Sequence, residues 1–156
     1  MNLIRLIGCI GVCEAAGMLG SLFTAQSVRT WYVGLTKPSF SPPNWLFAPV
    51  WITLYALMGI ALYIVWEKSK SLDVPAVVFV AFFVQLLLNA LWSFLFFGLR
   101  SPLWGSVEIA VLWLAILLTM ILFWRVSVTA GALLIPYIVW VTFASLLTFF
   151  IWKLNR

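Results

Sequence analysis

The side chains in this sequence that could carry a specific function are aromatic and amide groups, which recur at helical spacing in apolar stretches. Four stretches carry them: Trp51 and Tyr55; Gln85, Asn89, Trp92 and Phe96; Glu108 and Trp113; and Tyr137, Trp140 and Ala144. In the first, second and fourth sets, spacings of three or four residues place the side chains on one face of a helix. Indoles, phenols and amides combine flat apolar surface with a few hydrogen-bonding groups, as small-molecule pockets do. The pattern predicts a weakly polar, Trp-rich binding pocket.

The deep tryptophans also have an ordinary structural interpretation. Core packing explains Trp51, Trp92 or Trp140 singly, and an amide such as Asn89 usually links membrane helices by a hydrogen bond of about 0.6 kcal/mol. The gathering of indoles, phenols and amides at one depth favours a pocket that includes Asn89. Five other tryptophans end apolar stretches, as is typical of the lipid–water interface: Trp45, Trp66, Trp104, Trp124 and Trp152.

Two acidic residues, Glu14 and Glu108, lie inside apolar stretches. A charged group at the centre of a bilayer costs about 2.5–3.5 kcal/mol, so both should face the protein interior. We prefer a structural role for both over a proton relay. Glu108 lies near enough to a helix end to pair with Arg29 or Arg100.

The sequence offers no metal or catalytic constellation. It contains no histidine, and Cys9 and Cys13 are one helical turn apart, which suits a disulfide poorly. We interpret both as packing residues in a row, Cys9, Cys13, Gly17 and Ser21, that permits close helix approach. Paired carboxylates, a nucleophile with a base and a glycine-rich phosphate loop are also missing from the sequence.

The elements that must position the aromatic residues are transmembrane helices. Of the 156 residues, 65% are hydrophobic and 8% charged, whereas a soluble domain needs roughly 25% charged residues. A helix needs about 20 apolar residues to span a bilayer. We predict an all-α integral membrane protein, a five-helix bundle that forms one domain over residues 1–156. The predicted helices cover about 2–25, 45–66, 74–97, 102–124 and 128–152, the last kinked at Pro136.

The distribution of charged residues does not determine the orientation of the protein in the membrane. Basic residues at the predicted helix ends number four on the N-terminal side and five on the other, so they do not decide which side is inside. The net charge of +5 is scattered, and we expect no nucleic-acid partner. We expect a multi-pass protein of a bacterial cell membrane.

One connection, Gln26 to Asn44, is long. Long connections in compact domains are usually functional lids or disordered linkers. Aromatic residues (Trp31, Tyr32 and Phe40) and prolines, which lower the entropy cost of ordering, favour an ordered lid.

The loop and the helix faces together resemble the TspO/MBR family of tryptophan-rich sensory proteins and peripheral benzodiazepine receptors. The resemblance rests on Trp31-Tyr32-x-x-Leu35-x-Lys37-Pro38 and on Pro42-Pro43-x-Trp45-x-Phe47-x-Pro49-Val50-Trp51. It continues through Gln85-Leu86-x-x-Asn89-x-x-Trp92-Ser93, Phe97-Gly98 and Pro136-Tyr137-x-x-Trp140-Val141-x-Phe143-Ala144. These motifs cover nearly the whole chain.

The resemblance implies a homodimeric five-helix protein whose first loop covers a cavity for porphyrins, haem precursors, sterols or benzodiazepine-type drugs. Together with the helix-face pattern, the resemblance supports these ligand-binding residues: Tyr32, Trp51, Tyr55, Asn89, Trp92, Tyr137, Trp140 and Ala144. The lid residues are Trp31, Lys37, Pro38, Pro42 and Pro43. The sequence departs from sterol-associated members near its end, where Leu147 to Lys153 contains no tyrosine, and Thr148 replaces an asparagine common in the family.

Three functions are compatible with these residues. The leading hypothesis is a porphyrin receptor or translocator with a sensory or transport role and no obligatory cofactor. Because the chain has no histidine to ligate haem iron, metal-free porphyrin is the expected guest. The alternative is an enzyme that degrades porphyrin with light and oxygen, with Trp51 and Trp140 as candidate reactants. The third is a structural partner protein with a vestigial cavity.

Overall fold

The computed structural model describes residues 2–156, and its regular elements are helical throughout this range. The α-helices are α1 (Leu3–Arg29), α2 (Phe47–Lys68), α3 (Ala76–Ser93), α4 (Pro102–Val126), α5 (Val128–Ala132) and α6 (Ile135–Leu154). Short helical turns are η1 (Tyr32–Gly34), η2 (Asn44–Leu46) and the π-helical η3 (Phe94–Gly98). Five segments are long and apolar enough to cross a membrane: Leu3–Arg29, Asn44–Lys68, Ala76–Gly98, Pro102–Val126 and Val128–Leu154. The predicted all-α, five-span architecture is confirmed.

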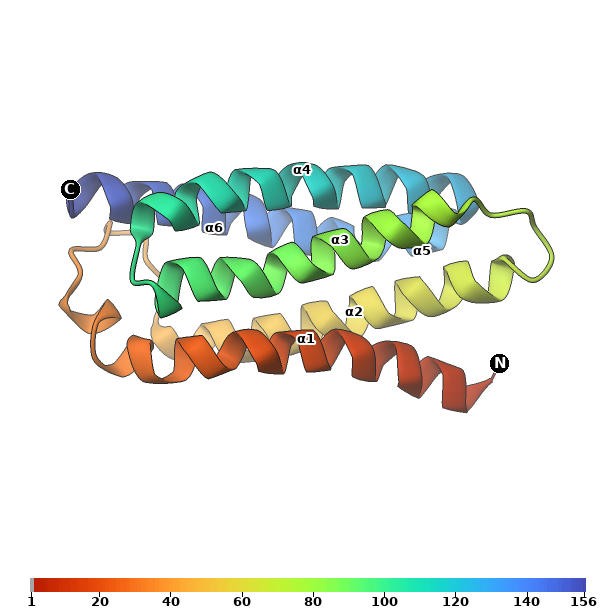
Figure 1. The fold of residues 1–156 in the computed structure, drawn as a ribbon, viewed down its shortest axis with the longest axis horizontal. Helices are drawn as coiled ribbons and strands as arrows, with labels where there is room; N and C mark the ends of the chain where they lie inside the picture. The colour runs from red at the N-terminus through yellow and green to blue at the C-terminus, as the bar shows by residue number, and fades with distance from the viewer. Residues whose placement is uncertain (1) are drawn as a thin grey trace.

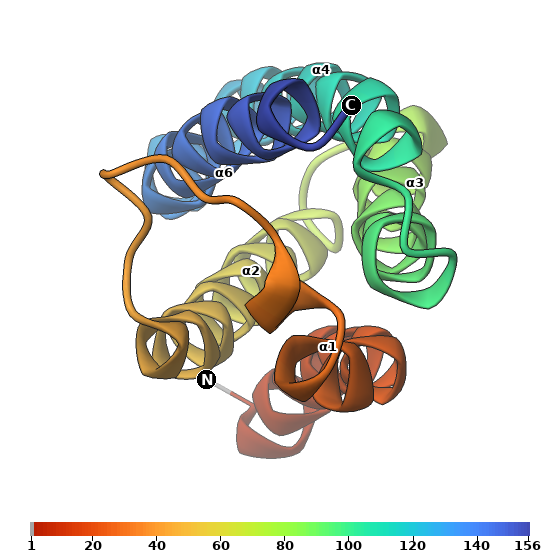
Figure 2. The same cartoon turned by 90° about the vertical axis from the view of Figure 1, so that its left-hand side faces the viewer.

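The spans form a single ring in which neighbours are antiparallel, except for α1 and α3, which run in the same direction (Figure 1). The chain ends lie at opposite ends of the bundle (Figure 1), and an end-on view shows α1, α2, α6, α4 and α3 in that order around it (Figure 2). Large apolar side chains such as Ile4, Leu22, Leu87 and Leu114 are 83%, 72%, 71% and 62% exposed. A face of this composition is stable only against hydrocarbon, so the protein is an integral, multi-pass membrane protein.

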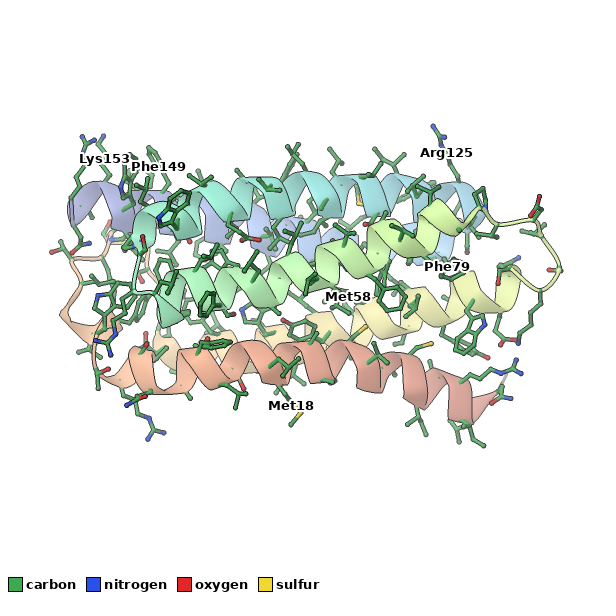
Figure 3. The ribbon with its side chains drawn as sticks, in the orientation of Figure 1. Met18, Met58, Phe79, Arg125, Phe149 and Lys153 are labelled. Atoms are coloured by element: carbon green, nitrogen blue, oxygen red, sulfur yellow. The ribbon has the colours of Figure 1, made fainter. Side chains whose placement is uncertain are left out.

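The bundle has two halves with different contents. The loop half contains the first loop (residues 30–43) and the C-terminus, and the far half contains the N-terminus and the α2–α3 turn (residues 69–75). Figure 3 labels Phe149 and Lys153 in the loop half and Arg125 in the far half. The first loop starts four residues later than predicted because α1 continues to Arg29. The Ser27 hydroxyl anchors this extra turn by donating to the Phe97 carbonyl at 2.8 Å.

Small residues let α1 approach its neighbours closely. A Cβ at Gly59 of α2 would lie 2.5 Å from the Ile10 Cα of α1, and one at Gly20 would lie 2.9 Å from the Ser93 Oγ of α3. Cys13, also on α1, is fully buried. The predicted packing row is wrong at its last member, because Ser21 is exposed and Gly20 takes the inward position. The reason is that 3.6 residues per turn do not keep a four-residue row on one face.

The last span is broken rather than kinked. Residues 128–152 were predicted as one helix, but α5 ends at Ala132 and α6 begins at Ile135. Pro136 lies in the first turn of α6, where its missing N–H costs no helical hydrogen bond. Inside a continuous helix its ring would clash with the carbonyl of residue 132, so the chain restarts there.

Candidate binding site in the loop half

The first loop is ordered by its contacts with the C-terminal end of α6. The Thr36 backbone donates its N–H to the Asn155 Oδ1 at 2.9 Å, and the Asn155 Nδ2 donates to the Thr36 carbonyl at 2.9 Å. The Phe40 ring lies 5.5 Å from that of Phe150 and 6.3 Å from that of Phe143. In Figure 2 the loop crosses the end of the bundle from α1 toward α6 and returns to α2. The loop therefore covers this end of the bundle.

The first part of the loop inserts two aromatic rings between the helix ends. The Trp31 ring lies 5.5 Å from the Phe96 ring, and the Tyr32 ring lies 5.7 Å from the Phe97 ring. Tyr32 is only 4% exposed, and its burial raises the pKa of its hydroxyl. The Lys37 ammonium sits 4.3 Å from the Tyr32 ring centroid, a cation–π contact. We call these four rings the end cluster.

A π-helical turn presents both phenylalanines of the end cluster. The Leu99 N–H donates to the Phe94 carbonyl at 2.8 Å, five residues back, which widens the end of the third span. Phe96 and Phe97 are 1% and 8% exposed as a result, although neighbours in a regular helix point about 100° apart. No pattern in the sequence predicted this turn, and π-turns often occur at functional sites.

A hydrogen-bond network lies deeper, at the level of Asn89. The Tyr55 hydroxyl donates to the Asn89 Oδ1, the Asn89 Nδ2 donates to the Tyr137 hydroxyl at 2.8 Å, and that hydroxyl donates to the Gln85 Oε1 at 3.0 Å. The Gln85 Nε2 in turn lies 3.9 Å from the Met58 sulfur. The network ties α2, α3 and α6 together. It uses both ends of the Asn89 amide, so Asn89 links helices as well as forming the floor of this region.

Three indoles form a layer above this floor. Trp51, Trp92 and Trp140 each lie three or four residues closer to the first loop than their network partners on the same helix. At 1.5 Å per residue this separation is about 5 Å. The Trp51 ring is 5.7 Å from that of Tyr55, the Trp92 ring stacks on Phe96 at 5.2 Å, and the Trp140 ring is 5.9 Å from that of Phe47. Trp92 thus joins this indole layer to the end cluster.

Polar atoms without partners mark the indole layer. The Nε1 atoms of Trp92 and Trp140 and both carboxyl oxygens of Glu108 are buried and lack a hydrogen-bond partner among residues 2–156. The predicted ion pair of Glu108 with Arg29 or Arg100 is therefore wrong. Glu108 faces the bundle interior at 6% exposure, whereas both arginines are exposed. Buried polar groups are nearly always paired, so such atoms suggest a site for water or a ligand.

Comparison with known protein families identifies the family of this chain. A model of the TspO/MBR family matches residues 9–153. The chain belongs to the TspO/MBR family.

Relatives in this family align along nearly the whole chain. It is 51% identical to a tryptophan-rich protein TspO from Archaeoglobus fulgidus, with 99% of each chain covered. It is 48% identical to the protein of the same name from Chlorobaculum tepidum, covering 99% of this chain and 98% of the relative. The human translocator protein is 38% identical over 88% of this chain and 82% of its own length. The resemblance predicted from the motifs is confirmed.

The structure of this TspO/MBR protein groups the predicted site residues in two layers. Trp51, Tyr55, Asn89, Trp92, Tyr137 and Trp140 lie in the indole layer and its floor. Tyr32, Trp31 and Lys37 belong to the outer cover. Ala144 is buried one turn beyond Trp140, and Pro38, Pro42 and Pro43 lie along the loop itself. Trp31 and Tyr32 contact Phe96 and Phe97.

Two contributors were missed in the sequence. Phe47 and Phe143 contact the Trp140 ring at centroid distances of 5.9 and 5.4 Å. Each stands three or four residues from a chosen tryptophan, Trp51 or Trp140, so the same-face rule could have included them. The Cys9 and Cys13 thiols are free, and residues 2–156 contain no group of three potential metal ligands.

Proposed function

We propose that this TspO/MBR protein is a membrane receptor or translocator that binds a porphyrin against the indole layer of Trp51, Trp92 and Trp140. The observation that carries the proposal is the pair of buried, unpartnered indole N–H groups of Trp92 and Trp140. A buried donor without an acceptor costs roughly 1–3 kcal/mol. A ligand that brings a flat apolar ring and acceptor atoms would recover this cost and stack on the indoles.

The charges at the loop end support an anionic guest. Arg29 and Arg100 are exposed near the first loop, and Lys37 lies on the loop beside Tyr32. Carboxylate arms of a porphyrin would find cations there. Because the chain has no histidine, iron would lack its usual axial ligand, so the proposed guest is metal-free. Other flat apolar ligands would use the same surface.

Entry of such a ligand requires motion of the loop. Trp92 is stacked on Phe96, and Trp140 contacts Phe47 and Phe143, so a porphyrin that reaches the indole layer from this end has to part the end cluster. Loops that close on a ligand commonly provide this kind of gating.

The homodimer implied by the resemblance stays a prediction.

The test is protoporphyrin titration of the protein in lipid nanodiscs, followed by the Soret band and by quenching of tryptophan fluorescence. Trp140→Phe should lower affinity about tenfold, the worth of one hydrogen bond of about 1.4 kcal/mol. Trp51→Phe should reduce it less, since the Trp51 Nε1 is not among the buried atoms that lack a partner. Trp104→Phe, on the lipid-facing surface with 57% exposure, is the matched control. Unchanged affinity in both site variants, or an equal loss in the control, would refute the pocket.

Hydrogen exchange locates the ligand independently. Porphyrin should slow exchange in residues 30–43 and leave residues 69–75 unchanged, because only the first loop would close on it. Protection confined to residues 69–75 would place the porphyrin in the far half and contradict the proposed site. The same samples, kept in the dark or illuminated, separate receptor from enzyme. Loss of the Soret band only in the presence of light and oxygen would support a porphyrin-degrading enzyme over a receptor.

A further inference from the structure

The far half contains a second hollow that the proposed porphyrin site does not use. It has a volume of about 390 Å³ and is formed by Gly8 and Val12 of α1, Trp66 of α2 with Ser69 directly after it, and Phe79 and Phe83 of α3. Ligand pockets commonly measure about 300–1,000 Å³. Figure 1 shows α2 between α1 and α3 in this half, and Figure 3 labels Phe79 there. We call this hollow the α1–α3 groove.

The groove opens toward the lipid. Val12, Phe83 and Trp66 on its walls are 48%, 48% and 43% exposed, and Gly8 leaves open space where a side chain would be, since an added Cβ meets no atom within 4 Å. Its lining is nearly all apolar. In a bilayer, the molecules that surround such an opening are lipid chains, and an unfilled apolar void would lose dispersion contacts on every wall.

A charged cluster stands at the membrane-surface end of the groove. The Arg5 Nη1 lies 3.2 Å from the Glu67 Oε1, which also pairs with the Lys70 ammonium. The Arg5 guanidinium also lies 5.9 Å from the ring centroid of Trp66, a groove residue. Two cations share one carboxylate, so the cluster keeps a net positive charge. Its side chains remain 33–41% exposed and can accept another anion.

We propose that the α1–α3 groove binds one acyl chain of an anionic glycerophospholipid, whose phosphate lies on Arg5 and Lys70. Arginine and lysine are the usual phosphate-binding side chains. Trp66 and Ser69 line the groove at the end of α2, the part of a span where tryptophan is usually found beside lipid headgroups. The apolar groove selects the chain and the cluster selects the charge. This site is separate from the porphyrin site, and neither proposal depends on the other.

The test uses a phosphatidylglycerol and a phosphatidylcholine that each carry a photoreactive group in one acyl chain. The protein is reconstituted with each lipid, irradiated and mapped by peptide mass spectrometry. We expect phosphatidylglycerol to label Val12 and Phe83 at least fivefold above lipid-facing Leu114 on α4, and phosphatidylcholine to label all three alike. Equal labelling of Val12 and Phe83 by the two lipids would overturn the charge selection and with it the proposal.

Two sets of variants sharpen the test. Gly8→Leu should fill the groove and lower phosphatidylglycerol labelling to the Leu114 level, while Gly11→Leu, which also meets no atom within 4 Å at its Cβ, should leave it unchanged. Thermal unfolding verifies that both fold. Replacing Arg5, Glu67 and Lys70 by glutamine together should abolish the preference for phosphatidylglycerol, since each basic residue near the surface is worth about a fivefold change in affinity. Unchanged labelling in Gly8→Leu, or cross-links from Val12 to a second copy of the chain, would refute a lipid occupant.

Discussion

The loop half and the far half of the bundle are held together differently. In the loop half, aromatic rings and a buried hydrogen-bond network join side chains of four spans with the first loop. In the far half, α1 and α2 meet through backbone contact at Gly59, and charged side chains meet at the surface. Side-chain contacts can be exchanged for contacts with a ligand, whereas close backbone packing cannot. The difference suggests that the loop half can open while the far half keeps the bundle assembled.

The largest expected effect comes from breaking the backbone contact. Gly59→Leu would drive its side chain into the Ile10 backbone, only 2.5 Å from the added Cβ, and α1 would have to separate from α2. Overpacking of this kind costs about 3 kcal/mol, measured as loss of thermal stability in detergent. Gly11→Leu, with open space at its Cβ, should cost much less. Equal losses would contradict the assignment of this contact as the anchor of the far half.

A smaller effect is expected from removing the network of the loop half. Asn89→Leu leaves the Tyr55 and Tyr137 hydroxyls without their amide partner, and we expect a loss of about 1–2 kcal/mol, near the upper end of intramembrane hydrogen bonds. Porphyrin affinity should also fall, because the floor of the indole layer is disturbed. Ser145→Ala removes only a bond to its own helix, to the Val141 carbonyl, and serves as control. A stability loss no larger than that of the control would show that the network is not a structural link.

Loosening the first loop should change local opening rather than global stability. Asn155→Ala removes both hydrogen bonds to Thr36, and we expect exchange in residues 30–43 to become about fivefold faster, the worth of about 1 kcal/mol. Residues 69–75 should not change. Lys153→Ala, at an exposed position in the last turn of α6, is the control. Faster exchange in both loops would mean that the two halves open together.

The smallest effect is a pH dependence of loop closure. Burial raises the pKa of Tyr32 in the closed loop, while an exposed tyrosine titrates near pH 10. The closed loop therefore holds the phenolic proton more tightly, so closure is fully favoured below about pH 10 and weakens as the pH rises through the higher pKa. Tyrosinate absorbance of the wild type minus Tyr32→Phe should show the raised midpoint, and Asn155→Ala should move it back toward 10. A wild-type midpoint at the ordinary value would contradict burial of this hydroxyl.

The sequence predicted the spans well because apolar length is a local property. It also predicted the grouping of Tyr55, Asn89 and Tyr137, since same-face spacing on three helices places them at one depth once the helices alternate in direction. Two features escaped it because each depends on contacts between distant segments: the π-turn at Phe94–Gly98 and the missing partner of Glu108. The inward position of Gly20 in place of Ser21 was missed for another reason, the drift of a four-residue row around a helix with 3.6 residues per turn. Spacing rules describe one helix at a time and do not give the neighbours of a side chain.

The hydrogen bonds between Thr36 and Asn155 also bear on how the chain is made. The two residues are 119 positions apart, so Asn155 is synthesised long after Thr36. Phe143 and Phe150, which contact Phe40, belong to the final span as well. The first loop is thus synthesised early, but it cannot form these contacts until α6 and Asn155 have been synthesised and the last span has been inserted into the bilayer. Until then the Trp-rich interior stays uncovered, so any nascent chain stalled before α6 would expose it.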